Sequence, residues 1–300
     1  MVYNESQDPY CSMCIFYVVY RKDWPNLYMS LRSLVKNWVG PKRVAFIAQD
    51  NNYDFINLFA SSVLKGWTIH QVPITELSII DYGDRHNCRG VGWDEQQLYK
   101  LYLPSQLAGR YQWFLNLDCK NILIKPAAPS SFMRFDTSCN QTVITIAGRY
   151  LTEQAREEMN NDPWTKEIHQ LGKELTGGSD ITVVPYTLCP WIFNGPITSS
   201  LWQRLGAWRW TEMKSTEYIL YWYTVNHLYL WDITLQCIGT WAEDPYHKGN
   251  ELNNITDRTL IYNSHINQFH THGKDIVTWL VRREILEYND IQPIFDLVVN

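Results

Sequence analysis

The segment FLNLDCKNILIKP, residues 114–126, holds an apolar stretch, a polar break, a second apolar stretch and a final proline. This pattern predicts two strands separated by a turn. Asp118 lies at the break, where a strand commonly presents a carboxylate to a metal ion or a phosphate. Two residues later, where a second carboxylate would be expected, the chain has Lys120. A site that would use negative groups to hold a cation therefore carries a positive one.

Apolar strands and helices alternate through the chain before and into this segment. The strands are expected at residues 14–21, 43–50, 68–74 and 111–119, and the helices at 23–38, 53–67 and 94–107. This alternation predicts an α/β fold with a parallel sheet and helices on both of its faces. Ligands of such sheets bind beyond the carboxyl ends of the strands. Asp50 and Asp118 both fall at such ends, so we expect them at one edge of a shared cleft.

Single residues indicate where these helices begin and end. Asp23 is expected to cap the first helix, with Pro25 in its first turn. Gly66 is expected to end the second helix. Pro104 is expected to interrupt the third helix, because proline cannot donate the helical hydrogen bond.

The second half of the chain has a less regular pattern. We expect strands at 142–148 and 259–266, an extended segment at 181–195, and helices near 151–174, 198–209, 216–228 and 275–288. We expect this half to extend the same sheet. Residues 1–300 would then form a single domain, with about residues 10–126 as one half and about 127–300 as the other.

The composition is that of a folded, water-soluble chain. Hydrophobic residues make up 45% of the 300 residues and charged residues 19%, far from the composition of disordered chains. The formal net charge is −5 and no long basic run occurs, which does not favour non-specific binding of nucleic acid. These values do not exclude a local basic groove. The 14 Trp, 19 Tyr and 10 Phe can form either a bulky core or stacking surfaces for sugars or bases.

The cysteines and the N-terminal residues bear on the compartment. The seven cysteines are irregularly spaced, and Cys11-x-x-Cys14 has no second pair, so a zinc site has little support. Free thiols in a reducing compartment are expected instead. The N-terminal residues lack the basic start of a signal peptide, and no apolar run reaches the roughly 18–20 residues of a membrane span. We therefore expect a cytoplasmic protein without a transmembrane segment.

Several segments, in a fixed order along the chain, carry a resemblance to a known family. GWDEQQLYKLYLPSQL (92–107) leads into YQWFLNLDCKNILIKP (111–126), and STEYILYWYTV (215–225) and FHTHGKD (269–275) follow. This set resembles the GT-A glycosyltransferases and is most similar to a bacterial and viral group among them. The resemblance covers about half of the chain, in patches. It implies a GT-A (Rossmann-like) fold with a mixed, mostly parallel sheet flanked by helices, a first half that binds a nucleotide sugar and a second half on the acceptor side.

The resemblance gives the opening segment a specific meaning. In the family, the second aspartate of an Asp-x-Asp motif binds a divalent cation, Mn²⁺ or Mg²⁺, that bridges the two phosphates of the donor. The matching residues here are Asp118, Cys119 and Lys120. A protonated lysine binds phosphate oxygens directly, so Lys120 would supply the charge of the metal and no metal would be required. Alternatively, Lys120 faces solvent and a metal binds Asp118 with His270 or His272.

Three further residues resemble donor-binding positions of the family. Asp50 would accept a hydrogen bond from the nucleobase, or it would simply begin the turn that follows its strand. Gln97 and Lys100 lie three residues apart, on one face of a helix, and would contact the ribose and a phosphate. Lys100 could equally be a solvated charge on that helix.

A late cluster of basic residues belongs to the same set. The segment 269–275 resembles one that closes over the diphosphate in several GT-A enzymes. His272 and Lys274 would bind phosphate there, and Gly273 between them would let the backbone approach the phosphate closely.

Glu217 is the candidate catalytic residue. It would act as the general base that takes the proton from the acceptor hydroxyl as that oxygen attacks the anomeric carbon, which inverts the configuration. A carboxylate at the start of a helix is also stabilised by the helix dipole, so a structural role stays open. If Glu217 only binds the acceptor, a retaining mechanism stays open as well.

The sequence thus predicts a glycosyltransferase that uses a nucleoside-diphosphate sugar, with UDP favoured over GDP, and a saccharide or glycan acceptor. Two alternatives remain at this stage. One is a viral enzyme that glycosylates a modified, hydroxylated base in DNA, where the aromatic residues would stack on a flipped base. The other is an inactive protein that binds a sugar nucleotide without turnover. The oligomeric state is not predicted.

Overall fold

Five strands form the central sheet of the computed structural model. In spatial order they are β10 (Trp191–Asn194), β4 (Trp113–Asn116), β1 (Met13–Val19), β2 (Arg43–Ala48) and β3 (Thr68–Gln71). The pairs β1–β4, β1–β2 and β2–β3 are parallel, and β10 is antiparallel to β4. Because β10 belongs to the second half of the chain, both halves contribute to one sheet.

The structure describes only part of the chain. The described residues are 11–49, 51–54, 56–74, 91–123, 126–146, 148–150, 183–185, 189–212, 217–228, 233–237, 242–243 and 278–280, with single positions between 153 and 177. Asp50 and the segment 269–275 lie outside them, as does the predicted strand 259–266.

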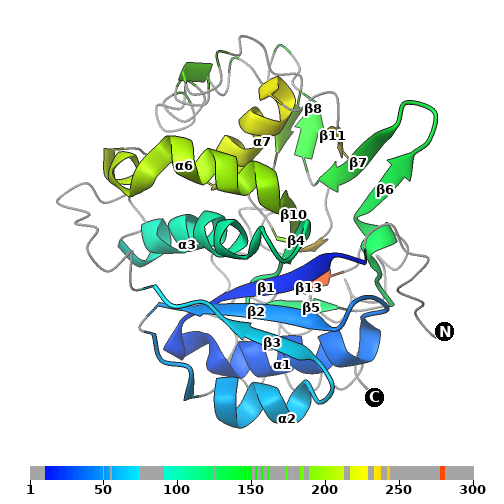
Figure 1. Ribbon diagram of the computed structural model, residues 1–300, viewed down its shortest axis with the longest axis vertical. Coiled ribbons are helices and arrows are strands. Elements are labelled where there is room, and N and C mark those ends of the chain that lie inside the picture. Colours follow the sequence, from blue (N-terminus) through cyan, green and yellow to red (C-terminus); the bar gives the residue numbers. More distant parts are fainter. Residues whose placement is uncertain are drawn as a thin grey trace, which may run out of the picture.

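Helices cover both faces of the central sheet (Figure 1). They are α1 (Trp24–Asn37), α2 (Ser61–Val63), α3 (Val91–Leu107), α6 (Gly195–Glu212) and α7 (Glu217–Leu228), with a 3-10 turn at Arg21–Asp23 and a π-helical turn at Ile56–Ala60. Helices α1 and α2 lie on one face, and α3 and α6 on the other. Helix α3 packs against α6, and both contact α7. The predicted fold class, α/β with a mixed, mostly parallel sheet flanked by helices, is confirmed.

Smaller sheets surround the central one. They contain β5 (Asn121–Leu123) with β13 (Thr278–Leu280) and β12 (Ala242–Glu243), β6 (Met133–Asp136) with β7 (Gln141–Ile146) and β11 (Ile233–Cys237), and β8 (Gly148–Tyr150) with β9 (Val183–Pro185). A 3-10 turn, Pro129–Ser131, precedes β6. The two predicted strands of the segment 114–126 are β4 and β5, and they belong to different sheets.

Two of the predicted elements are wrong in part. Pro104 does not interrupt α3, which continues to Leu107, because the packing of α3 against α6 outweighs the missing hydrogen bond. The predicted helix 275–288 contains a strand, since Thr278–Leu280 pairs antiparallel with Asn121–Leu123. This pairing joins segments far apart in sequence, and local periodicity does not report such partners.

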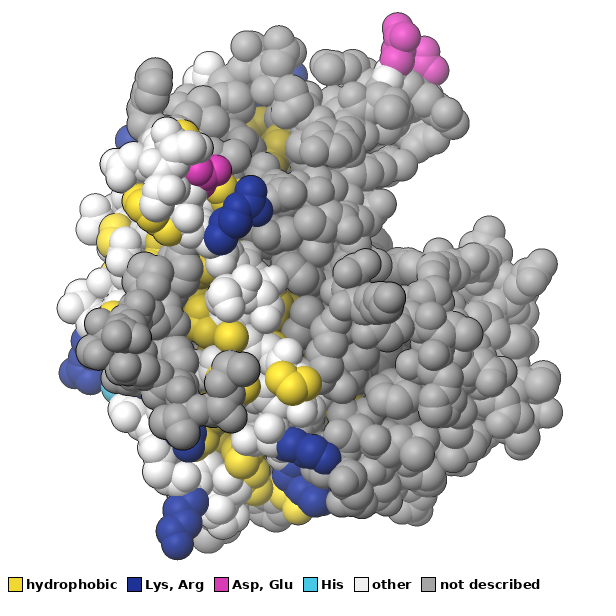
Figure 2. All heavy atoms as spheres, turned by 90° about the vertical axis from the view of Figure 1, so that its right-hand side faces the viewer, with side chains coloured by type: hydrophobic (Ala, Val, Ile, Leu, Met, Phe, Trp, Pro, Cys, Tyr) yellow, Lys and Arg dark blue, Asp and Glu magenta, His cyan; other side chains and the backbone are white. Residues whose placement is uncertain are grey.

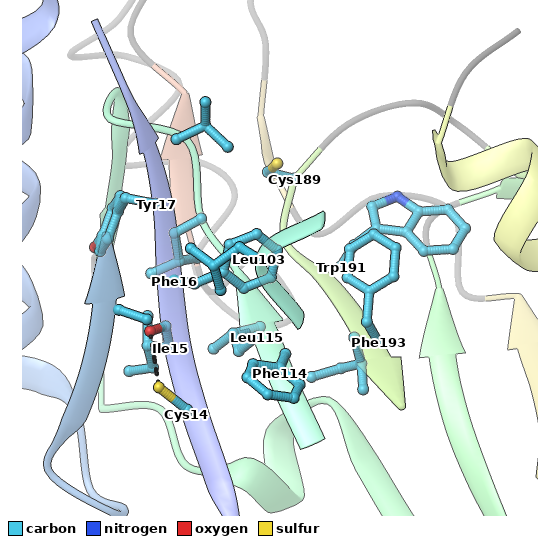
Figure 3. Packing of buried hydrophobic residues seen from close by; sticks show 14 of the residues in the cluster. Cys14, Ile15, Phe16, Tyr17, Leu103, Phe114, Leu115, Cys189, Trp191 and Phe193 are labelled. Carbon is cyan, nitrogen blue, oxygen red and sulfur yellow. Dashed lines mark hydrogen bonds between the residues drawn. The ribbon is translucent and has the colours of Figure 1, made fainter. Parts of the chain in front are cut away.

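The core explains why β1 is continuously apolar. All seven residues of Met13–Val19 are buried, which is typical of a strand covered on both faces of its sheet. Figure 3 shows how side chains of β1, β4 and β10 pack together. The ring of Phe16 lies 6.4 Å from that of Phe114 and 5.9 Å from that of Phe193, measured between ring centroids. Many of the aromatic residues are therefore core residues.

Charge on the described surface is dispersed. On the face in Figure 2, the described Lys and Arg side chains lie singly or in a small group, and the described part of this face shows no continuous basic stripe. Among the described helices, none is long and apolar enough to cross a membrane.

Candidate functional site

Three charged side chains meet beyond the carboxyl end of β4. Lys100 comes from α3, Asp118 from the turn after β4, and Glu217 is the first residue of α7. The Nζ atom of Lys100 lies 3.3 Å from Oδ1 of Asp118 and 3.2 Å from Oε1 of Glu217. We call these three residues the Lys100 cluster. Their side chains are 4%, 20% and 0% exposed, respectively, so the cluster reaches solvent mainly through Asp118.

Gln97 completes the surroundings of Glu217. With its amide nitrogen facing the carboxylate, Gln97 donates to Oε1 of Glu217 at 3.0 Å and also to Oε2. Gln97 is 3% exposed and lies on the same face of α3 as Lys100, as their spacing predicts. Two neighbouring side chains of α3 thus hold the carboxylate at the start of α7, and Lys100 is not a solvated helix charge.

The burial and the close charges move all three pKa values. Burial raises the pKa of Glu217 to about 7, although the ammonium of Lys100 opposes this shift. Burial alone would raise the pKa of Asp118, but Lys100 and then Lys120 hold it below its usual value. Burial alone would lower the pKa of Lys100, but Asp118 and Glu217 raise it above its usual value. The cluster therefore keeps its lysine protonated and leaves Glu217 able to exchange a proton near neutral pH.

The turn that carries Asp118 and Lys120 is closed by its own hydrogen bonds. The backbone N–H of Asp118 donates to Oδ1 of Asn121 at 2.7 Å, and the N–H of Asn121 donates to the carbonyl of Asp118 at 2.9 Å. The buried thiol of Cys119 donates to the carbonyl of Val18 on β1 at 3.3 Å. Cys119 thus ties the turn to the sheet, while Asp118 and the half-buried Lys120 keep part of their surface in solvent.

Three polar residues that were given no role from the sequence are linked to Lys100 through the hydroxyl of Tyr218. The hydroxyl of Tyr218 lies 3.0 Å from Nζ of Lys100, 2.7 Å from Oδ1 of Asn116 and 2.7 Å from Sγ of Cys189. A sequence signal existed for two of them, because Asn116 interrupts an apolar strand and Tyr218 follows Glu217 directly. Cys189 has no such signal.

The structure therefore brings together four of the residues that the sequence selected, namely Gln97, Lys100, Asp118 and Glu217. Lys120 lies in the same turn as Asp118. The remaining candidates, Asp50, His270, His272 and Lys274, lie outside the described residues.

The fit of a divalent cation can be judged from the residues near Asp118. In the described part of the chain, no group of three or more His, Cys, Asp and Glu side chains is arranged to hold a metal ion. Oδ1 of Asp118 already faces the ammonium of Lys100, whose charge repels a cation. Among the described residues Asp118 thus faces an ammonium, and His270 and His272, the other expected ligands of a metal ion, lie outside the described residues.

Comparison with known proteins finds similarity in structure but not in sequence. No protein-family model and no curated protein matches the chain. The apo form of mouse xyloside xylosyltransferase 1 matches with a TM-score of 0.46 and 8% identity, over 92% of this chain and 99% of that chain. Core-mannan synthase A from Aspergillus fumigatus, in a Mn/GDP form, matches with a TM-score of 0.46 and 11% identity, over 78% and 77%. The mannosyltransferase Ktr4p from S. cerevisiae matches with a TM-score of 0.39 and 12% identity, over 72% and 68%. These similarities are too distant to assign an activity.

Proposed function

We propose that the protein is a glycosyltransferase that moves a sugar from a nucleoside-diphosphate sugar to a hydroxyl group of a saccharide or glycan. The Lys100 cluster carries this proposal, because it lies beyond the carboxyl end of a strand of the parallel sheet, where α/β folds bind ligands. Burying two carboxylates with one ammonium costs free energy that an apolar core would avoid. A functional role accounts for the presence of these charges in the interior, and the resemblance to GT-A enzymes indicates glycosyl transfer as the reaction.

The donor would bind at the side of the cluster that reaches solvent. Asp118 would accept a hydrogen bond from a hydroxyl of the donor, and Lys120 would bind the phosphate oxygens directly. As the bond between the anomeric carbon and the diphosphate breaks, negative charge grows on the diphosphate. The ammonium groups of Lys120 and Lys100 would stabilise that charge in the transition state. UDP remains the proposed nucleotide, on the strength of the resemblance alone.

Glu217 is proposed as the general base toward the acceptor. A pKa of about 7 suits this role, because a base works best when its pKa lies near the operating pH. Its carboxylate is fully buried against Gln97 and Lys100, so an acceptor hydroxyl reaches it only if the start of α7 moves. If the carboxylate of Glu217 stays inaccessible to the acceptor during the reaction, its role is to hold Lys100. The prediction of an inverting mechanism then has no catalytic base to support it.

A panel of UDP- and GDP-sugars tests the proposed function. The parent protein should bind at least one of them, and it should release the nucleoside diphosphate slowly with water and faster with a saccharide acceptor. Excess chelator should leave both rates unchanged if Lys120 replaces the metal. Lys36→Met should keep both parent rates, since Lys36 is an exposed lysine in the last turn of α1.

The same panel separates the alternatives. Binding without any release of nucleoside diphosphate would indicate the inactive sugar-nucleotide-binding protein. Transfer to DNA with a hydroxylated base, lost steeply as salt rises, would indicate the DNA-modifying enzyme. Absence of binding to every nucleotide sugar would contradict the proposed function.

A further inference from the structure

A buried hydrogen-bond network contacts Lys100 through the hydroxyl of Tyr218. It consists of Asn116 on β4, Cys189 just before β10, and Tyr218 on α7. Asn116 and Tyr218 are fully buried, and Cys189 nearly so. All three meet at the hydroxyl of Tyr218, which also contacts Nζ of Lys100 at 3.0 Å.

The backbone fixes the orientation of the Asn116 amide in this network. The Nδ2 group of Asn116 donates to the carbonyls of Phe16 and Leu117, each at 3.4 Å, so its Oδ1 atom must face Tyr218. The Tyr218 hydroxyl donates to Oδ1 of Asn116 at 2.7 Å, and in its 2.7 Å contact with Sγ of Cys189 either group can be the donor. The thiol of Cys189 donates to the same Oδ1 atom at 3.2 Å. Because an ammonium has donors and no acceptor, Lys100 donates to the oxygen of Tyr218 at 3.0 Å.

The ring of Tyr218 is held as firmly as its hydroxyl. It stacks on Trp191 with a centroid distance of 4.6 Å and an interplanar angle of 9°, and on Phe193 at 5.9 Å and 28°. Nζ of Lys100 lies 4.8 Å from the centroid of the same ring. Stacked rings have few rotamers open to them, so the hydroxyl presents its lone pairs at a fixed point.

We propose that Tyr218, oriented by Asn116, is a positioning residue that fixes the ammonium of Lys100 between Asp118 and Glu217. An ammonium has three N–H donors, and three acceptors lie within 3.3 Å of Nζ, one each from Asp118, Glu217 and Tyr218. Without the third acceptor, Nζ can rotate and shift toward either carboxylate. This inference rests on the proposed function only where it concerns transfer, because the position of Lys100 can be measured without a substrate.

Tyr218→Phe tests the proposal, because it removes the hydroxyl and keeps the stacked ring. Tyr221→Phe is the matched control. Tyr221 is a buried tyrosine on the same helix, and its hydroxyl accepts a hydrogen bond from the backbone N–H of Asn194 at 2.7 Å. Each variant loses a hydroxyl with a short buried bond, so a purely structural role predicts similar behaviour for both.

The first readout is the ammonium signal of Lys100 in NMR spectra of lysine-labelled protein. In the parent, we expect a slowly exchanging ammonium with a nuclear Overhauser contact to the hydroxyl proton of Tyr218. The signal should broaden or disappear in Tyr218→Phe and persist in Tyr221→Phe. Absence of the contact in the parent, or an unchanged ammonium signal in Tyr218→Phe, would overturn the proposal whether or not the protein transfers sugar.

The second readout is turnover with the best nucleotide sugar. Loss of a hydrogen bond to a charged group should lower kcat of Tyr218→Phe by about tenfold, with KM for the donor nearly unchanged, because the ammonium acts mainly in the transition state. Tyr221→Phe should keep parent kinetics. An equal fall of kcat in both variants would make Tyr218 a structural residue. A parent without turnover would contradict the proposed function, and the NMR result would still decide the role of Tyr218.

Discussion

Replacing Lys100 by methionine tests the charge balance of the cluster. Methionine is similar in length and apolar, so Lys100→Met removes the charge with little change in packing. The substitution leaves Glu217 fully buried beside Gln97 without a neighbouring positive charge from Lys100, and it leaves Asp118 without the ammonium at 3.3 Å. Removing one partner of a buried ion pair typically costs about 3–5 kcal/mol, because the other charge stays buried and unpaired. We expect a loss of this size in the free energy of unfolding at pH 8.

The loss should depend on pH in a definite direction. The pKa of Glu217 in the folded parent is about 7, above the ordinary value of 4.5, so folding favours the protonated form. Stability from this group is present below pH 4.5 and is lost as the pH rises through the folded pKa. Without Lys100, which lowers that pKa, the folded pKa rises further and the loss grows toward alkaline pH. Lys100→Met should therefore be less destabilising at pH 5.5 than at pH 8.

Chemical denaturation of the parent, Lys100→Met and the surface control Lys36→Met at both pH values measures this effect. The control should change stability by no more than about 0.5 kcal/mol. Adding Glu217→Gln to Lys100→Met should recover part of the loss, because it removes the unpaired buried carboxylate. A loss below about 1 kcal/mol at pH 8, or one that is equal at the two pH values, would refute the assignment of Lys100 as the shared counter-ion.

Further predictions concern the chemistry. Glu217→Gln should bind the donor almost normally and lose turnover by on the order of 10²–10⁴-fold if Glu217 is the base, and near-normal transfer would reduce Glu217 to a helix-start residue. Lys120→Ala should lose more in turnover than in affinity for the nucleoside diphosphate, because its charge would act mainly as the leaving group departs. Loss of parent activity in excess chelator would contradict the proposal that Lys120 takes the place of a metal ion. Lys120→Asp would restore the Asp-x-Asp motif. Activity of this variant only with manganese would support the proposal that Lys120 replaces the metal ion.

The strands and helices near the site followed from local sequence. The run CIFYVVYR at 14–21 predicts a buried strand, and the structure has β1 at Met13–Val19 because both faces of that strand are covered. The strand Thr278–Leu280 could not be predicted in the same way. Its partner lies more than a hundred residues away, and the pairing depends on a meeting of distant segments that no local pattern encodes.

The residues that meet around Lys100 were selected one by one from the sequence, but their network was not. Strand-end position and the resemblance selected Asp118. The resemblance selected Gln97, Lys100 and Glu217, and the spacing of Gln97 and Lys100 placed them on one face of α3. Their shared ion pairing depends on how α3, β4 and α7 pack. The role of Lys120 at the diphosphate stays a prediction, and the buried ammonium beside Asp118 belongs to Lys100. Asn116 and Tyr218 were given no role from the sequence. Their part in the network depends on the hydrogen bond between them, and this bond forms only because α7 packs near β4.

The most direct test of the proposed donor site is the release of nucleoside diphosphate by the parent, Asp118→Asn and the exposed control Asp54→Asn with one nucleotide sugar that the parent binds. Loss of a hydrogen bond to a charged group costs about 1.5–3 kcal/mol, which corresponds to a fall of about ten- to hundredfold in rate. The account predicts such a fall, or a larger one, in Asp118→Asn and the parent rate in Asp54→Asn. Equal rates in all three proteins would contradict the claim that the Lys100 cluster is the site of transfer.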